Sequence, residues 1–176
     1  MAGIDSYNLF TGTAASPVQA LQTTSTTTAS TNYIDMGEGK DAFGNVLTNP
    51  DPGMGKPLFV NIVCTTTPTA TGSGTTIKFD LQSGPDSGGT GTSQAGTCTA
   101  WTTIASTSAI PIADFVKGYT TFIAVPPYMQ QAMNAISGGV SSPATQYLQI
   151  QQTTGTSTQA GGYYSAWLSG EPVSTV

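Results

Sequence analysis

The chain has 176 residues, of which only 7% are charged and 38% are hydrophobic, with a formal net charge of −5. Globular domains usually carry about 25% charged residues, so the polar surface here must consist mainly of uncharged side chains and glycine. The four cationic residues are scattered lysines, which argues against nucleic-acid binding, because that binding depends on clustered Lys and Arg. No apolar run approaches the ~20 residues of a membrane helix, and the N-terminus lacks a secretory signal pattern, so we expect neither.

Short alternating segments between turn-rich stretches predict an all-β chain, because Thr, Ser, Gly and Pro disfavour helix interiors. Residues 1–28 are predicted to be an N-terminal arm, and residues 29–176 to form one domain. About seven to eight strands are enough for two packed sheets, so the domain is predicted to be an antiparallel β-sandwich. The predicted strands cover residues 31–36, 58–64, 75–82, 100–105, 108–112, 120–125, 147–152 and 163–168.

The side-chain alternation of these strands predicts which residues form the core. The strand at residues 58–64 is apolar on both faces, which is typical of a central or covered strand. The residues expected to point inward are Leu58, Val60, Ile62, Cys64, Ile77, Phe79, Leu81, Leu148 and Ile150. The residues expected to point outward are Lys78, Asp80, Gln82, Gln149 and Gln151. In the last strand, Tyr164, Ala166 and Leu168 are expected to lie opposite Tyr163 and Trp167.

Two stretches rich in Gly, Ser and Pro, residues 37–57 and 83–99, are predicted to be long loops. One stretch, residues 128–136, has apolar residues at helical spacing. A Gly-Gly and a Ser-Pro follow it directly, so the sequence leaves open whether it is a helical turn or a loop.

The chain lacks the residues on which most catalytic sites depend. General acid–base and triad chemistry usually recruits a histidine, and this sequence has none. It contains no Ser-x-x-Lys pattern, and no glycine-rich loop precedes a helix with a lysine. We therefore predict that the protein is not an enzyme, with no catalytic residues and no cofactor. A hydrolase is a third function class that the missing histidine argues against.

The two cysteines and one acidic cluster allow structural interpretations. Cys64 is expected to be a buried small side chain, and synthesis in the cytosol favours free thiols, although a bridge to Cys98 stays open. The acidic residues Asp35, Glu38, Asp41 and Asp51 resemble a set of Ca²⁺ ligands, but their spacing matches no EF-hand loop. We predict that they belong to a solvated loop and bind no metal.

Three aromatic residues of the last predicted strand, Tyr163, Tyr164 and Trp167, allow three interpretations. They pack in the core, they form a sugar-stacking platform as in lectin-like sandwiches, or they contribute to a protein interface, where Tyr and Trp are enriched. The sequence alone does not choose among these.

A series of short motifs follows the order found in a known family. Ile-Asp-Ser-Tyr-Asn-Leu-Phe at residues 4–10 precedes a Thr/Ala-rich run at residues 11–28 and Ser-Thr-Asn-Tyr-Ile-Asp-Met-Gly at residues 30–37. Later motifs cover residues 58–63, 77–83, 101–104, 110–111, 147–150 and 161–168. In this order, the chain resembles the capsid cement (decoration) proteins of podovirus-type tailed phages, typified by that of a Bordetella phage.

The resemblance implies a jelly-roll-like sandwich that is made in the host cytoplasm and binds the outer surface of an assembled virion capsid. It implies that the major capsid protein is the partner and that neighbouring subunits are cemented. A second copy of the chain is the other implied partner, as a homodimer rather than a homotrimer. Because flexible arms can reach across joints between capsomers, residues in the predicted arm are the candidate capsid contacts. These are Ile4, Tyr7, Leu9, Phe10, Pro17 and Leu21.

One alternative function stays open at this stage. A phage head fibre or adhesin could use the same kind of sandwich to bind glycans through Tyr163 or Trp167. Glycan binding by the free protein, without affinity for shells, would favour this alternative.

Overall fold

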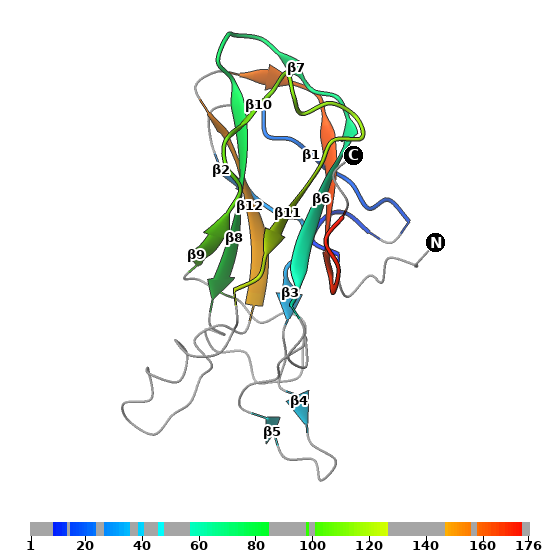
Figure 1. Ribbon diagram of the computed structural model, residues 1–176, viewed down its shortest axis with the longest axis vertical. Helices are drawn as coiled ribbons and strands as arrows, with labels where there is room; N and C mark the ends of the chain where they lie inside the picture. The colour runs from blue at the N-terminus through cyan, green and yellow to red at the C-terminus, as the bar shows by residue number, and fades with distance from the viewer. Residues whose placement is uncertain are drawn as a thin grey trace.

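The structure is a computed structural model of the chain. It describes residues 9–13, 15–23, 27–35, 39–40, 46–47, 57–84, 98, 101–126, 147–155 and 158–173. Every regular element within these residues is a β-strand, and all the strand pairs are antiparallel. Two sheets pack face to face, so the protein is an all-β sandwich, as the sequence predicted (Figure 1).

Each of the two main sheets combines strands from both ends of the chain. The four-stranded sheet has the order β1 (Gln19–Ala20), β14 (Tyr163–Ser169), β6 (Phe59–Thr66) and β11 (Thr120–Ala124). The six-stranded sheet has the order β10 (Ile110–Pro111), β8 (Thr76–Gly84), β12 (Tyr147–Gly155) and β2 (Thr27–Ala29). In it, β3 (Ile34–Asp35) also pairs with β12, and β9 (Thr102–Ser106) pairs with β8.

Two small sheets accompany the sandwich. At one end, β7 (Thr69–Ala70) pairs with β13 (Gln159–Ala160), as Figure 1 shows above the main sheets. The second pair, β4 (Gly39–Lys40) with β5 (Val46–Leu47), lies in the stretch predicted to be a loop. The sequence missed these two-residue strands because they are too short to show an alternating pattern.

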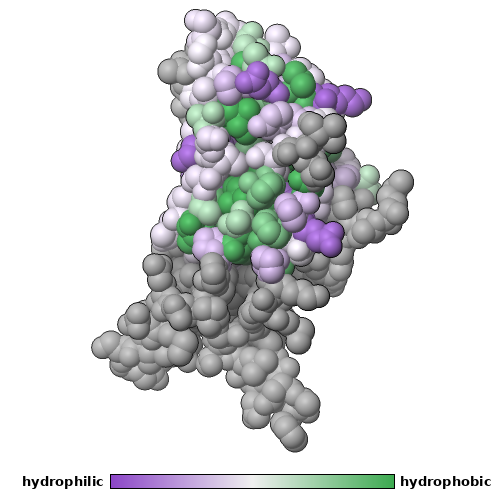
Figure 2. All heavy atoms as spheres, viewed as in Figure 1, coloured by the Kyte–Doolittle hydropathy of each residue, from purple (hydrophilic) through white to green (hydrophobic). Residues whose placement is uncertain are grey.

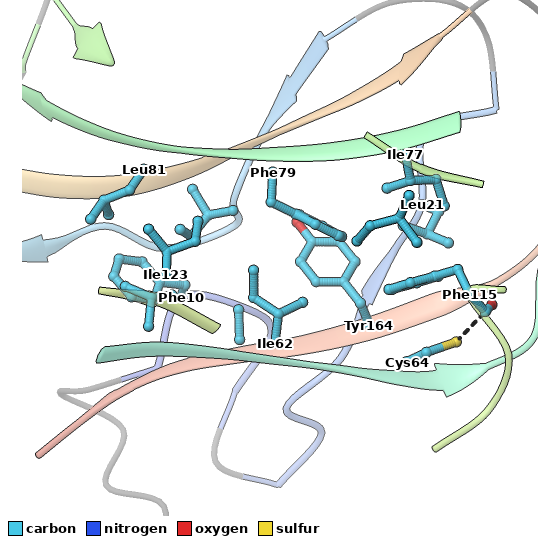
Figure 3. Packing of buried hydrophobic residues seen from close by; sticks show 14 of the residues in the cluster. Phe10, Leu21, Ile62, Cys64, Ile77, Phe79, Leu81, Phe115, Ile123 and Tyr164 are labelled. Carbon is cyan, nitrogen blue, oxygen red and sulfur yellow. Dashed lines mark hydrogen bonds between the residues drawn. The ribbon is translucent and has the colours of Figure 1, made fainter. Parts of the chain in front are cut away.

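The core lies between the two sheets and confirms the predicted inward faces. The side chains that β8 directs inward, Ile77, Phe79 and Leu81, have no exposed surface. They face the fully or almost fully buried Val60, Ile62 and Cys64 of β6. At the centre, the rings of Phe79 and Tyr164 lie 5.0 Å apart, and Figure 3 shows Tyr164 reaching from its own sheet toward Phe79.

The N-terminal segment differs from the predicted free arm in every described part. Phe10 and Leu21 are buried in the core, β1 extends the four-stranded sheet, and β2 extends the six-stranded one. The boundary between an arm at residues 1–28 and a sandwich at residues 29–176 is therefore corrected for these residues. The burial of these residues could not be predicted from the sequence, because single apolar residues in a Thr/Ala-rich run show no periodicity.

The boundaries of other strands differ from the predicted ones for local reasons. Of the strand predicted at residues 31–36, the described residues form strand only in β3, since Asn32 N–H donates to the Phe10 carbonyl at 2.9 Å instead of joining a sheet ladder. The strands β8 and β12 are longer than predicted. Their pairing is continuous from Thr76, opposite Gly155, to Gly84, opposite Tyr147. Residues 128–136, where the sequence left a helical turn open, lie outside the described residues, as does most of the predicted loop at residues 83–99.

The Tyr164 hydroxyl is buried in this core, and no hydrogen-bond partner for it lies among the described residues. Burial raises the pKa of this hydroxyl, because the charged form would be desolvated. A buried polar group without a partner costs about 1–3 kcal/mol. The ring of Tyr164 is therefore favourable to folding, and its oxygen is not.

We predict that Tyr164→Phe leaves the free energy of unfolding unchanged or raises it by about 1–3 kcal/mol, because the substitution removes only the unpaired oxygen. Urea denaturation with an unchanged m-value measures this difference. As a control, Tyr164→Ala should lower stability by about 3–5 kcal/mol, since it removes the ring. A clear loss of stability in Tyr164→Phe would contradict the assignment.

We also predict that Phe10→Ala lowers the free energy of unfolding by about 3–5 kcal/mol, because Phe10 is a core residue and not part of a free arm. Ser16→Ala, at an exposed position of the same segment, should stay within about 0.5 kcal/mol of the native chain. If both variants were equally stable, the N-terminal segment would not be part of the folded core in solution.

Candidate contact surfaces

The predicted capsid contacts do not form one exposed arm. Leu9, Phe10 and Leu21 are at most 3% exposed and belong to the protein's own interior. From this position they stabilise the sandwich and cannot touch a capsid, so their assignment as contacts is corrected. Pro17 is half-buried, and its carbonyl accepts a hydrogen bond from Thr11 Oγ1 at 3.1 Å. Ile4 and Tyr7 lie outside the described residues.

The segment that follows Leu9 closes one side of the sandwich by pairing along the edge of β14. Leu9 forms an antiparallel bridge with Trp167, and Phe10 N–H donates to the Ala166 carbonyl at 2.9 Å. Farther along, the Gln19 amide nitrogen donates to the Ala29 carbonyl at 2.9 Å, while its oxygen accepts from Thr31 N–H at 2.7 Å. The Gln19 side chain of β1 thus hydrogen-bonds to backbone groups beside β2, at the edge of the opposite sheet. This protects an edge that would otherwise be open to pairing with another chain.

The acidic cluster carries no described metal site. Asp35 ends β3, whereas Glu38, Asp41 and Asp51 lie outside the described residues. Among the residues that the structure describes, no three His, Cys, Asp or Glu side chains come close enough to hold an ion.

The three aromatic residues of β14 do not form a single platform. Tyr164 points into the core, whereas Tyr163 is 43% exposed and Trp167 is half-buried on the opposite face. Of the three interpretations left open by the sequence, core packing therefore applies to Tyr164 alone, and the other two stay open for Tyr163 and Trp167. Tyr164 is a core residue, and Tyr163 and Trp167 belong to an outer surface.

This outer surface is rich in aromatic side chains from three strands. Because Val60 and Ile62 of β6 point inward, their neighbours Phe59 and Val63 point outward. The ring of Phe59 meets that of Phe122 on β11 edge to face, with 5.6 Å between centroids, and Phe122 is 41% exposed. We name the set Phe59, Val63, Phe122, Tyr163 and Trp167 the outer aromatic face. Hydrophobic residues gather over β11 in Figure 2.

The C-terminal segment is fixed to the same face. Asn61 pairs with both Phe122 and Trp167 in the sheet, and its side chain is buried. Its amide nitrogen donates to the Glu171 carbonyl at 3.0 Å, and its oxygen accepts from Val173 N–H at 2.9 Å. A single buried amide therefore holds residues 171–173 beside the aromatic side chains.

The outer face of the six-stranded sheet has the opposite character. Gln149 Nε2 donates to Gln82 Oε1 at 2.7 Å, and Gln82 Nε2 donates to Gln151 Oε1 at 3.0 Å and to Thr103 Oγ1 at 3.4 Å. We name these four residues the amide face. The sequence predicted that Gln82 and Gln149 point outward, yet each is only 7% exposed, and the two side chains are hydrogen-bonded to each other.

The charged residues next to the amide face are neutralised by one another. Lys78 Nζ lies 2.7 Å from Asp80 Oδ1, and the Ser106 hydroxyl donates to the same carboxylate. Asp80 was predicted to point outward, and it does, but it is largely buried by these neighbours. The two outer faces of the sandwich therefore differ in kind. One is aromatic, and the other is polar with little net charge.

Cys64 and Cys98 do not form a disulfide, which answers the question that the sequence left open. Cys64 is buried, and its thiol donates to the Thr66 carbonyl at 3.4 Å and to the Phe115 carbonyl at 3.5 Å (Figure 3 shows the second bond). Cys98 is half-buried. Burial raises the pKa of the Cys64 thiol, which reduces the thiolate available at neutral pH.

Comparisons with known proteins leave the family open. No family model matches the chain, and no curated protein is significantly similar to it. Over the described ranges, the chain has no helix of the length and apolarity that crossing a bilayer requires.

We predict that a thiol reagent such as DTNB modifies Cys98 in the native protein and reaches Cys64 only after unfolding, because the reagent needs an accessible thiolate. The time course at pH 7.5–8 should show about one fast equivalent and a second one released by denaturant. Cys98→Ser should remove the fast phase and Cys64→Ser should keep it. Two equally fast thiols, or no thiol after unreduced denaturation, would contradict the structure.

Proposed function

We propose that this protein is a structural virion protein that binds the outer surface of an assembled phage capsid and cements neighbouring major capsid protein subunits. The observation that carries the proposal is the outer aromatic face, where Phe122 and Tyr163 are exposed on an otherwise regular sheet. Its second support is the ordered series of motifs that resembles cement proteins. The role proposed is structural and not enzymatic, in keeping with a sequence that lacks histidine.

The outer aromatic face has the chemistry of a protein-binding surface. Phe, Tyr and Trp are enriched at the centres of interfaces and supply most of their binding energy, whereas charged residues are depleted there. None of the five side chains of this face is charged, so docking desolvates no ion within it. An assembled shell repeats the same binding site many times, and an oligomer that touches several subunits gains from effective concentration.

Among the described strands, β11 is the last in the order of the four-stranded sheet, and the part of it around Phe122 offers a place for a second copy of the chain. On either side of β11, Val125 N–H donates to the Leu58 carbonyl at 2.8 Å, and Cys64 N–H donates to the Tyr119 carbonyl at 2.9 Å. The backbone N–H and C=O groups of the odd-numbered residues of β11 therefore point toward β6. By alternation, those of Phe122 and Ala124 point away from β6. Antiparallel pairing of two β11 strands around Phe122 would extend the sheet into a homodimer and enlarge the aromatic face.

A revised arm hypothesis concerns the residues before Leu9. Ile4 and Tyr7 remain candidate capsid contacts, and the chain that carries them starts from the bridge between Leu9 and Trp167. Deleting all of residues 1–28 would remove Phe10 and Leu21 from the core, so the loss of binding would not distinguish an arm from unfolding. Deleting residues 1–8 is the sharper test, because it keeps every described contact of the segment.

We predict that Phe122→Thr combined with Tyr163→Thr lowers occupancy on undecorated capsids by at least about tenfold, because truncating a hot-spot residue at an interface costs about 2 kcal/mol or more. Co-sedimentation of the full chain with empty shells measures the occupancy. Val116→Thr, at an exposed apolar position in the turn before β11, is the matched control and should bind normally. All variants must first show native thermal unfolding.

Three outcomes of this assay decide between the candidate functions. Unchanged binding of the double variant would refute the aromatic face as the contact, and unchanged binding of the chain without residues 1–8 would refute the arm. If the native chain fails to bind any shell, the cement proposal itself is wrong. Binding to a glycan array through Tyr163 or Trp167, without shell binding, would then favour the adhesin alternative.

A further inference from the structure

The chain's own C-terminal segment lies over the centre of the outer aromatic face. Asn61 of β6 pairs with Phe122 on one side and with Trp167 on the other, so its side chain lies between these two on the outer side of the sheet. That side chain is only 2% exposed, although the neighbouring Phe122 is 41% exposed. The two hydrogen bonds of Asn61 place residues 171–173 over it. We name residues 171–173 the C-terminal cover.

Both hydrogen bonds of Asn61 go to the backbone of the cover. The amide nitrogen donates to the Glu171 carbonyl, and the amide oxygen accepts from the N–H of Val173, two residues farther along. In any extended segment, the carbonyl of one residue and the N–H of the second residue after it point to the same side. A primary amide offers a donor and an acceptor that match this pair. The site therefore suits an extended backbone of other sequences as well.

The cover can leave without disturbing a strand. Beyond Asn61, its described hydrogen bonds are made with Ser169, the last residue of β14. The Ser169 hydroxyl donates to the Glu171 carbonyl at 3.0 Å and accepts from the Glu171 N–H at 3.1 Å. Between them, Gly170 has open space around its Cβ position. Since the bonds of Ser169 are local to the segment, Asn61 alone ties the cover to β6.

The cover brings a charge to a face that otherwise has none. The strands of the four-stranded sheet contain no charged residue, whereas Glu171 is exposed on the cover. Among the described residues, the one ion pair joins Lys78 to Asp80, so Glu171 has no cationic partner there. Burying an unpaired carboxylate under a docked protein is costly. Docking at the centre of the aromatic face is therefore favoured when the cover moves aside.

Once the cover leaves, the Asn61 amide needs a new donor and a new acceptor. A buried amide without partners is unfavourable, so a flat side-chain contact over Asn61 would not suffice. An extended backbone segment of the partner would restore both bonds. Phe122 and Trp167, on either side of Asn61, would then contact the side chains of that segment.

We propose that an extended segment of the capsid protein replaces the C-terminal cover at Asn61 when this protein docks. The inference rests on the proposed cementing function and adds that the contact surface is autoinhibited in the free chain. The apparent affinity for shells is then the intrinsic affinity multiplied by the fraction of chains in which the cover is open. Releasing the cover should therefore strengthen binding, provided that Asn61 is kept.

A synthetic peptide of residues 169–176 tests the site without any shell, because its fit is the one that the structure shows. Full-length Val173→Pro loses the N–H that donates to Asn61, so its cover should open while Asn61 stays in place. We expect the peptide to bind this variant at least about tenfold more tightly than the native chain, as followed by NMR. Val173→Ala keeps the N–H and should bind the peptide as weakly as the native chain. No binding to Val173→Pro, or equal binding to the native chain, would overturn the proposal.

The shell assay tests the exchange itself. At a protein concentration that leaves most sites empty, Val173→Pro should raise occupancy at least about threefold, and Val173→Ala should not. Asn61→Leu also frees the cover but removes the receiving amide, so its occupancy should not exceed that of the native chain. Asn61→Thr takes its place if that variant lacks native thermal unfolding. Occupancy by Val173→Pro that is unchanged or lower, or an equal rise in both variants, would refute the exchange.

Failure of this inference and failure of the cementing role give different results. If the native chain occupies shells and Val173→Pro does not exceed it, only the exchange is wrong. If neither chain binds shells, the cementing role is wrong, and so is the capsid protein as the partner. The peptide titration then still decides whether Asn61 receives an extended segment.

Discussion

Hydrogen bonds from neutral side-chain amides join the N-terminal segment, the two sheets and the C-terminal segment of this protein. Gln19 links β1 to the edge of β2, Asn32 donates to the Gly12 carbonyl at 2.7 Å, and Asn61 holds the C-terminal segment. The Gln22 backbone is held between two further amides, since its N–H donates to Gln152 Oε1 and its carbonyl accepts from Gln159 Nε2, both at 2.8 Å. With 7% charged residues, the chain has few ion pairs available, and these amides replace them. Such bonds are insensitive to salt, unlike surface ion pairs.

The same shortage of charge explains why the two outer faces differ. A sheet face without ions must be either apolar or covered with amides and hydroxyls. Around β6 the chain places Phe59 and Val63, and the neighbouring strands add further aromatic residues. Around β8 and β12 it places Gln82, Gln149 and Gln151, which satisfy one another. The first arrangement leaves apolar surface that gains free energy when it is covered by protein. The second remains favourable in water and presents oriented hydrogen-bonding groups.

The sequence predicted the elements whose periodicity is strong and missed those that depend on distant partners. Alternation in β6, β8 and β12 was long enough to identify Phe79, Ile62 and Ile150 as core residues, and all three are fully buried. Phe10 and Leu21 were assigned to a free arm, because nothing in a Thr/Ala-rich run reveals that β14 has an open edge to receive them. The outer aromatic face was equally hidden. Phe59 and Phe122 are 63 positions apart in the numbering and become neighbours only through the pairing of β6 with β11.

If the protein binds a capsid as proposed, the closure of one edge by the N-terminal segment constrains how it bears load there. Leu9 is anchored at Trp167, and β14 pairs with β6 as far as Ser169, so the chain is fixed to the four-stranded sheet near both ends of its described part. The proposed contact surface is the outer face of that same sheet. Force that enters through a shell subunit and through residues near either terminus is therefore shared by neighbouring hydrogen-bonded strands and does not have to pass across the hydrophobic interface between the sheets. Separating strands along their length requires many backbone hydrogen bonds to break together, which raises the barrier to detachment. A sandwich with a free arm would concentrate the same force on a single flexible connection.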